Sequence, residues 1–230
     1  WAYDSLADRE ASVTLQPDTI HRAFSNTKLF TTVLVLKLAE LGHWQLDDPL
    51  KRWIPGFATV RVLRPGATTL DDTEPLQRDI TIRQLITHTA GLAHGVFDPE
   101  GLLYKAYFAT GVRGYTTTLA EQMDRLVQLP LSSQPGTQWE YALGIDVLAR
   151  LCEIATGLRF SAALQQHIFG PLGPADTGFV LRPDQVPRLA ALYKGDLLDP
   201  MKPGLERLAD TPWPNAYLQP VARESGAGGL

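Results

Sequence analysis

Ser25 and Lys28 form a pair that could carry nucleophilic chemistry. They stand three positions apart at the start of an apolar segment with helical periodicity. Residues i and i+3 share one face of a helix, so the hydroxyl and the amine can meet. A serine becomes a good nucleophile when a neighbouring base accepts its proton, and a lysine can be that base if burial or nearby cations lower its pKa. The alternative is a serine that caps the helix beside a surface lysine.

Tyr141 is a candidate for a second proton-transfer group. It lies in a turn, residues 139–144, just before a strongly helical segment. A tyrosine there can project into a cleft, and a nearby lysine cation stabilises the phenolate and lowers the tyrosine pKa. Ser25, Lys28 and Tyr141 would then form a nucleophile with two coupled bases. The alternative is a half-buried tyrosine whose hydroxyl reaches the surface.

Other catalytic patterns fit the sequence less well. It has no Gly-x-Ser-x-Gly elbow, no His-Glu-x-x-His motif and no glycine-rich loop leading into a helix. We therefore expect no metal and no cofactor. His88 follows a short helical pattern without an acid–His–Ser spacing around it, which favours a structural histidine that bonds nearby backbone over a catalytic one.

Composition limits the class of protein and its partners. The chain has 230 residues, 44% of them apolar, which suits one large domain or two small ones. With a net charge of −4 and no basic run, nucleic acid is not an expected partner. The longest apolar run, 33–36, is too short to span a membrane. The single cysteine, Cys152, excludes an internal disulfide framework, and its apolar helical surroundings favour a small buried side chain.

The compartment and the oligomeric state stay open at this stage. No signal peptide is recognisable, and the sequence begins with Trp1 rather than Met, so its beginning could have been removed. On these grounds the cytoplasm is favoured slightly.

The element that must position Ser25 and Lys28 is a predicted helix over residues 25–41, which stops at Gly42. Its apolar residues lie on two sides, which predicts a helix that is buried over most of its circumference. The first residues, 1–12, read as a strand that runs into a turn. Further helices are predicted over 49–53, 82–88, about 100–108, 118–129, 144–156 and 160–169, with loops and short irregular strands from 181 onward.

Six segments, taken in order, resemble a known family. They are residues 24–28, 46–50, 80–92, 135–141, 144–157 and 168–179. Together they resemble the serine β-lactamase and penicillin-binding-protein superfamily, in the branch of carboxylesterases called family VIII, over nearly the whole chain. The resemblance implies an α+β, β-lactamase/DD-peptidase-like fold, present here as mostly the helical portion with part of the antiparallel sheet. Residues 1–230 would then be a single incomplete domain, helix-rich over about 25–175 and irregular over 176–230.

The resemblance also implies roles for the candidate residues. Ser25 would be the acylated nucleophile, Lys28 its proton acceptor, and Tyr141 the group that relays the proton to leaving group and water. Leu143 stands where β-lactamase-type members carry an asparagine, and a leucine cannot hydrogen-bond the amide of a lactam or peptide. We therefore expect a serine carboxylesterase that acts on a small-molecule ester, without nucleic acid or membrane as partner.

Two alternatives remain. One is another activity of the same superfamily, namely β-lactamase, D-amino-acid peptidase or acyltransferase. The other is an inactive member that serves as a binding module, because the family's chains are usually longer. The resemblance places the family's third motif and second oxyanion donor beyond Leu230.

Overall fold

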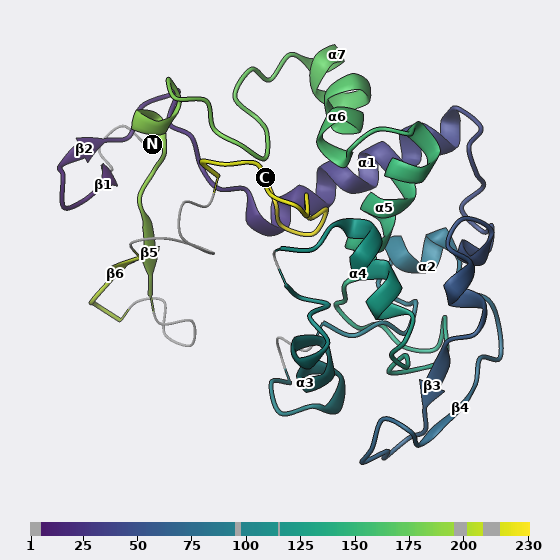
Figure 1. The fold of residues 1–230 in the computed structure, drawn as a ribbon. Helices are drawn as coiled ribbons and strands as arrows, with labels where there is room; N and C mark the ends of the chain where they lie inside the picture. Colours follow the sequence, from purple (N-terminus) through teal and green to yellow (C-terminus); the bar gives the residue numbers. More distant parts are fainter. Residues whose placement is uncertain (1–5, 95–97, 115, 196–201, 209–216) are drawn as a thin grey trace. The chain divides into compact units, whose positions relative to one another are not determined.

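The computed structural model describes residues 6–94, 98–114, 116–195, 202–208 and 217–230. Helices make up most of the regular structure, and short antiparallel strand pairs accompany them (Figure 1). The predicted α+β class is confirmed. The strand predicted near Trp1 lies partly outside the described residues, of which the first is Leu6. Within the described part, no helix is long and apolar enough to cross a membrane.

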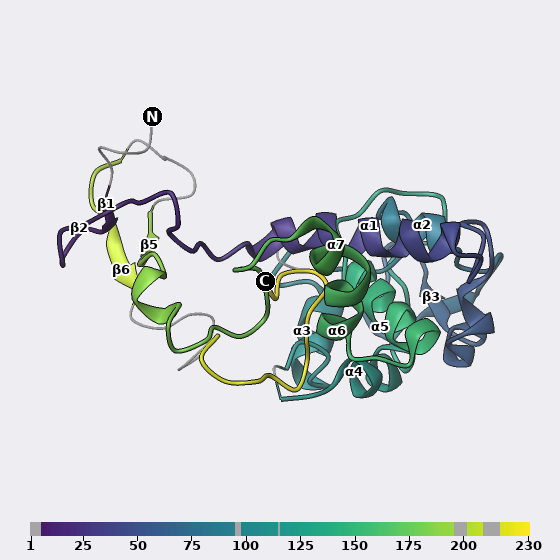
Figure 2. The same cartoon turned by 90° about the horizontal axis from the view of Figure 1, so that it is seen from above.

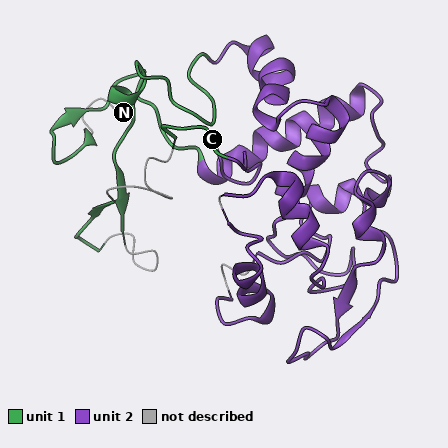
Figure 3. Cartoon of the chain, viewed as in Figure 1, with its two compact units in different colours: residues 1–23, 175–221 green, residues 24–174, 222–230 purple. Residues whose placement is uncertain are grey.

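The described residues group into two compact units (Figure 3). The larger unit contains residues 24–174 and 222–230 and holds all the candidate residues. The smaller unit contains residues 1–23 and 175–221. The single domain expected over 1–230 stays a prediction.

Helix α1 (Thr27–Glu40) follows a short 3₁₀ turn, η1 (Phe24–Asn26). Its buried residues form one stripe that packs against α5 (Gly144–Thr156), α6 (Phe160–Leu164) and η4 (Gln165–Phe169). The prediction that α1 is buried over most of its circumference is wrong among the described residues: Leu29 is 66% exposed and Val33 is 49% exposed. Apolar residues occur on both sides of α1, but packing partners cover only one of them.

Helix α5 is the centre of the larger unit. It contacts α1, α2 (Ile82–Ile86), α4 (Leu119–Leu126) and α6, and most of its residues are buried (Figure 2). It ends at Gly157, whose φ of +69° is the left-handed conformation that glycine adopts without strain. Cys152 is fully buried, as predicted, and burial raises the pKa of its thiol.

The remaining helices agree with the predictions in position more than in length. Helices α2 and α4 both begin with a capping box, Thr81 with Gln84 and Thr118 with Glu121. Both end before the predicted boundaries at 88 and 129, α2 because His88 has a φ of +56° that a right-handed helix cannot include, and α4 at its C-cap Val127. The helix predicted over 160–169 is α6 followed by the π-helical turn η4. The other helical elements are α3 (Leu102–Ala109), α7 (Gly170–Leu172), η2 (Leu50–Arg52), η3 (Pro55–Ala58) and η5 (Val186–Arg188).

The described strands pair locally and antiparallel, each with its neighbour in the chain. In the larger unit, β3 pairs with β4 in register from Arg61–Pro75 to Leu63–Thr73. In the smaller unit, the backbone of Ala191 donates to Ala7, and Ile20 bridges to Leu189. The strands are β1 (Leu6–Asp8), β2 (Val13–Thr14), β3 (Arg61–Leu63), β4 (Thr73–Pro75), β5 (Leu192–Lys194) and β6 (Glu206–Leu208).

Candidate active site

The structure brings Ser25, Lys28 and Tyr141 together. The Nζ atom of Lys28 donates to Ser25 Oγ at 3.3 Å, and Ser25 Oγ lies 3.1 Å from the Tyr141 hydroxyl. Lys28 Nζ also lies 4.8 Å from the centre of the Tyr141 ring. Ser25 and Tyr141 are 116 residues apart in the sequence, so tertiary packing alone creates this contact. The hydroxyl thus has two groups within reach that can exchange protons with it.

Ser25 lies in η1, two residues before α1 begins. The N-cap of α1 is Asn26, and no side chain caps this helix end. The alternative of a capping serine is therefore wrong. Phe24, just before Ser25, has a φ of +45°, a conformation that is uncommon and strained for a residue with a β-carbon. The exposed hydroxyl of Ser25 is consequently presented on a sharp turn rather than on a helix face.

Tyr141 is positioned by the turn before α5 and by two histidines. Its ring centre lies 5.1 Å from that of His88 and 5.1 Å from that of His94. The backbone N–H of Ala142 donates to His88 Nδ1 at 3.2 Å, and the N–H of Glu140 donates to the His88 carbonyl at 2.9 Å. The prediction that His88 bonds nearby backbone is confirmed. These bonds fix the backbone on both sides of Tyr141.

Burial lowers the pKa of both histidines. For His88 the second cause is the charge of Lys28. For His94 burial acts with the charges of Arg113 and Lys28 and lowers the pKa to about 4. An Arg113 nitrogen lies 3.3 Å from His94 Nδ1, and because a guanidinium can only donate, the proton of neutral His94 sits on Nε2. Both rings are therefore neutral at pH 7.

Sequence reasoning missed several residues around this cluster. His94 carries no spacing signal, since it simply follows Gly91-Leu92-Ala93 in a loop. The carbonyl of Ala227, which accepts from Lys28 Nζ at 2.5 Å, comes from the far end of the sequence. Asp146 offered one detectable signal, because it is a charged residue between the apolar residues Ile145 and Val147 near the start of a predicted helix.

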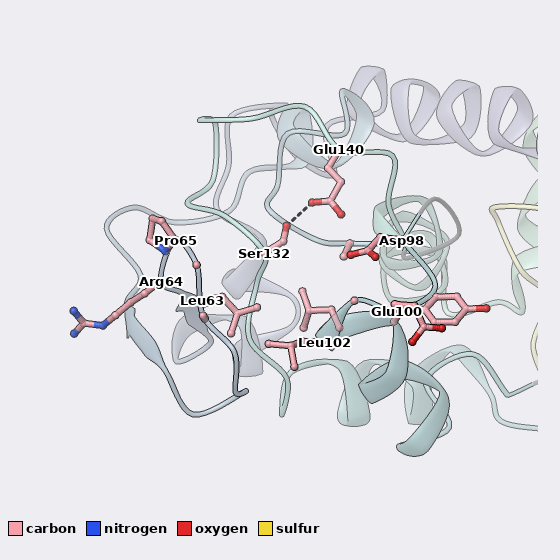
Figure 4. Close-up of a pocket in the computed structure, with 14 residues that line it drawn as sticks. Leu63, Arg64, Pro65, Asp98, Glu100, Leu102, Ser132 and Glu140 are labelled. Carbon is pink, nitrogen blue, oxygen red and sulfur yellow. Dashed lines mark hydrogen bonds between the residues drawn. The ribbon is translucent and has the colours of Figure 1, made fainter.

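A separate cavity of about 560 Å³ is lined by Ser132, Glu140 and residues of the segments 63–67 and 98–104 (Figure 4). Glu140 and Asp98 point into it, and Ser132 Oγ donates to Glu140 at 2.5 Å. Burial and the charge of Asp98 raise the pKa of Glu140. The described lining of the cavity does not include Ser25, Lys28 or Tyr141, so these three residues are not part of it.

The described residues contain no group of three or more His, Cys, Asp and Glu side chains that could hold a metal ion. Ser25 Oγ contacts a lysine and a tyrosine, and the tyrosine ring contacts two neutral histidines. Such a set suits proton transfer to and from a hydroxyl.

Comparisons with known proteins show the family of this chain. The beta-lactamase family model matches residues 1–230. Esterase EstB of Burkholderia gladioli is 35% identical over 239 residues, which cover 98% of this chain and 57% of EstB. Monacolin J acid methylbutanoyltransferase of Aspergillus terreus is 36% identical over 180 residues, 76% of this chain and 42% of that enzyme.

The fold is shared as well. The structure of EstCE1, described as a hydrolase with promiscuous acyltransferase activity, superposes with a TM-score of 0.76 at 27% identity. The match covers 98% of this chain and 58% of EstCE1. The chain spans about half the length of the relatives it matches. The β-lactamase/DD-peptidase-like fold expected from the sequence is thereby confirmed, and the chain belongs to the beta-lactamase family, where it is similar to esterases of the family VIII type.

Proposed function

We propose that this protein is a serine hydrolase that cleaves small-molecule carboxylic esters through an acyl-enzyme on Ser25. The observation that carries the proposal is the contact of one exposed serine hydroxyl with both Lys28 and Tyr141. The names of the similar proteins, an esterase and an acyltransferase, support acyl transfer as the chemistry.

In the first half-reaction Ser25 Oγ attacks the ester carbonyl carbon. Its proton passes to the Lys28–Tyr141 pair, both of which lie within hydrogen-bond reach of Ser25 Oγ. The bond between the carbonyl carbon and the alkoxy oxygen then breaks, and the pair returns the proton to the departing alcohol. In the second half-reaction water attacks the acyl-enzyme, gives a proton to the pair, and Ser25 takes that proton back as the acid leaves.

The negative charge on the carbonyl oxygen needs donors during both steps. The backbone N–H of Ser25 belongs to the first turn of η1, where N–H groups have no partner within the helix, and it would be one such donor. Loss of one donor of this kind typically costs roughly 2.7–4 kcal/mol of transition-state stabilisation. The second donor stays a prediction.

Leu143 favours an ester over a lactam or a peptide. It is the N-cap residue of α5 and is only 5% exposed. At this place an asparagine could hydrogen-bond the amide of a substrate, and a leucine offers no such group. An ester has no amide group, so it loses no hydrogen bond when a leucine stands at this position.

Transfer of the acyl group to another acceptor is the second candidate function. The similarity to a methylbutanoyltransferase favours it, because the same acyl-enzyme can react with an alcohol in place of water. Product analysis after adding a large excess of an alcohol separates transfer from hydrolysis. Nitrocefin turnover tests for β-lactamase activity in the same way.

The proposal is tested with p-nitrophenyl esters and the Ser25→Ala variant. Wild-type protein should release p-nitrophenol, and Ser25→Ala should not. A fluorophosphonate should add to the peptide that contains Ser25, as seen by mass spectrometry. Ser12→Gly is a suitable control, because Ser12 lies in an exposed turn with a φ of +53° that glycine adopts readily. Full ester hydrolysis by Ser25→Ala would show that Ser25 is not the nucleophile.

A further inference from the structure

Residues 225–230 form a short segment that packs onto the start of α1. The backbone N–H of Phe24 donates to the Leu230 carbonyl, and the Leu230 N–H donates to Thr27 Oγ1, both at 3.1 Å. Thr31 Oγ1 donates to the Gly226 carbonyl at 2.7 Å. Residues 225–230 are thus joined to η1 and the first turns of α1, directly beside Ser25.

Asp146 holds this segment from the other side. It is the third residue of α5, and it is only 2% exposed. Its Oδ1 accepts from the Ser225 hydroxyl at 2.7 Å and from the Ala227 N–H at 3.1 Å. Its Oδ2 accepts from the side chain of Gln122 at 3.2 Å.

These contacts on Asp146 are all made by uncharged donors. A buried carboxylate is costly unless it is well hydrogen-bonded, and here the three bonds offset that cost. An apolar residue at this position would leave the three donors without this acceptor, so Asp146 contributes to stability. A reason beyond stability lies at Ala227, whose N–H donates to Asp146 and whose carbonyl is free to bind another group.

Ala227 connects Asp146 to Lys28. Its N–H bonds to Asp146, and its carbonyl accepts from Lys28 Nζ at 2.5 Å. Lys28 Nζ in turn lies 3.3 Å from Ser25 Oγ. The lysine side chain is long and flexible, so a fixed acceptor is needed to keep its amine near the serine.

We propose that Asp146 is a positioning residue, which fixes the Ala227 carbonyl and thereby aims the Lys28 amine at Ser25. The inference rests on the proposed function, since it assigns to Asp146 a part in the acylation of Ser25. Oδ1 is the oxygen that acts, because it receives both bonds from the segment. Asp146 touches neither the serine nor the substrate, and its effect reaches them only through Ala227 and Lys28.

The central experiment compares Asp146→Ala with Asp146→Asn in the full chain. The burst of p-nitrophenol from a p-nitrophenyl ester gives the acylation rate and the apparent substrate dissociation constant. Asp146→Ala should slow acylation by about 10- to 100-fold, as displacement of a reacting group by about 1 Å does, and leave the dissociation constant unchanged.

Asp146→Asn should keep the acylation rate within about fivefold of the wild type. Its Oδ1 can still accept both bonds, although a neutral acceptor is weaker than a charged one. Its new NH₂ group faces Gln122 Nε2, so the Gln122 amide must turn to present Oε1, which is buried without a partner in the described structure. If Asp146→Asn loses as much as Asp146→Ala, the positioning role of Oδ1 is overturned.

Leu148→Ala is the matched structural control. Leu148 is fully buried on the same helix, so this variant should lower the melting temperature and leave acylation per folded molecule unchanged. If Asp146→Ala acylates Ser25 at the wild-type rate, or loses no more rate than Leu148→Ala, the proposal is wrong.

Hydrogen exchange supplies a readout that does not depend on activity. The amides of residues 225–230 should exchange faster in Asp146→Ala than in the wild type and in Asp146→Asn, while those of 147–156 should stay protected. Unchanged exchange at 225–230 would overturn the proposal. If wild-type protein fails to acylate Ser25, the proposed function fails, and the exchange result still reports on Asp146.

Discussion

Gly226 lies so close to Ala149 that a β-carbon added to Gly226 would stand 2.8 Å from the Ala149 side chain. The same added atom would stand 2.9 Å from the carbonyl oxygen of Ile145 and 3.1 Å from Thr31 Cγ2. Only a glycine at position 226 lets the segment 225–230 pass between α1 and α5. The backbone approach at Gly226 is what brings the Ala227 carbonyl within reach of Lys28.

Gly226→Ala should therefore destabilise the protein and slow acylation. Overpacking of this kind costs about 1–3 kcal/mol, and relief of the clash moves the Ala227 carbonyl away from Lys28. Urea denaturation measures the first effect and the p-nitrophenol burst the second. Gly178→Ala is the control, because its added carbon meets nothing closer than 4.0 Å. Equal stability of the two variants would contradict the clash.

Tyr141→Phe should remove a proton-transfer group without disturbing the fold. The ring keeps its packing against His88 and His94, and only the hydroxyl that contacts Ser25 is lost. General acid–base groups contribute typically about 10²- to 10⁴-fold in rate, so acylation should fall within that range. Burst kinetics and the melting temperature are measured together. Tyr104→Phe is the control, and wild-type acylation by Tyr141→Phe would remove the hydroxyl from the mechanism.

Much of the larger unit could be predicted from local sequence signals. The apolar periodicity of α5 together with Gly157 marks both of its ends, and the Thr118–Glu121 capping box marks the start of α4. The spacing of Ser25 and Lys28 allowed their contact. It could not supply Tyr141, whose place near Ser25 depends on the packing of α1 against α5 and became an expectation mainly through the family resemblance.

The contacts of α1 and the bonds of Ala227 show where local signals end. Apolar residues on two sides of α1 predicted burial that the described structure provides on one side only. The carbonyl that holds Lys28 belongs to the backbone of Ala227. Every residue type has the same backbone carbonyl, so the side chain of residue 227 does not reveal this role. A role carried by a backbone atom leaves no trace in the choice of side chain.

His94 should make stability depend on pH below neutrality. Its pKa falls from 6.5 to about 4 on folding, so between these values the unfolded chain binds a proton that the folded protein does not. The free energy of unfolding should then decrease as the pH falls from 6.5 towards 4, and level off below. His94→Gln should flatten this slope in urea titrations at a series of pH values, whereas His21→Gln, at an exposed position, should keep it. An unchanged slope in His94→Gln would show that His94 is not the group responsible.

Lys28→Met should raise the pKa of both His88 and His94. The charge of Lys28 lowers both values, and its removal leaves burial as the first cause, so both should stay below 6.5. Histidine ring signals followed by NMR titration measure the two pKa values, and Lys37→Met, on the exposed end of α1, is the matched control. A rise in both confirms that the charge of Lys28 acts on the two histidine rings beside Tyr141. If neither pKa moves, the charge of Lys28 is not a cause of the lowered values.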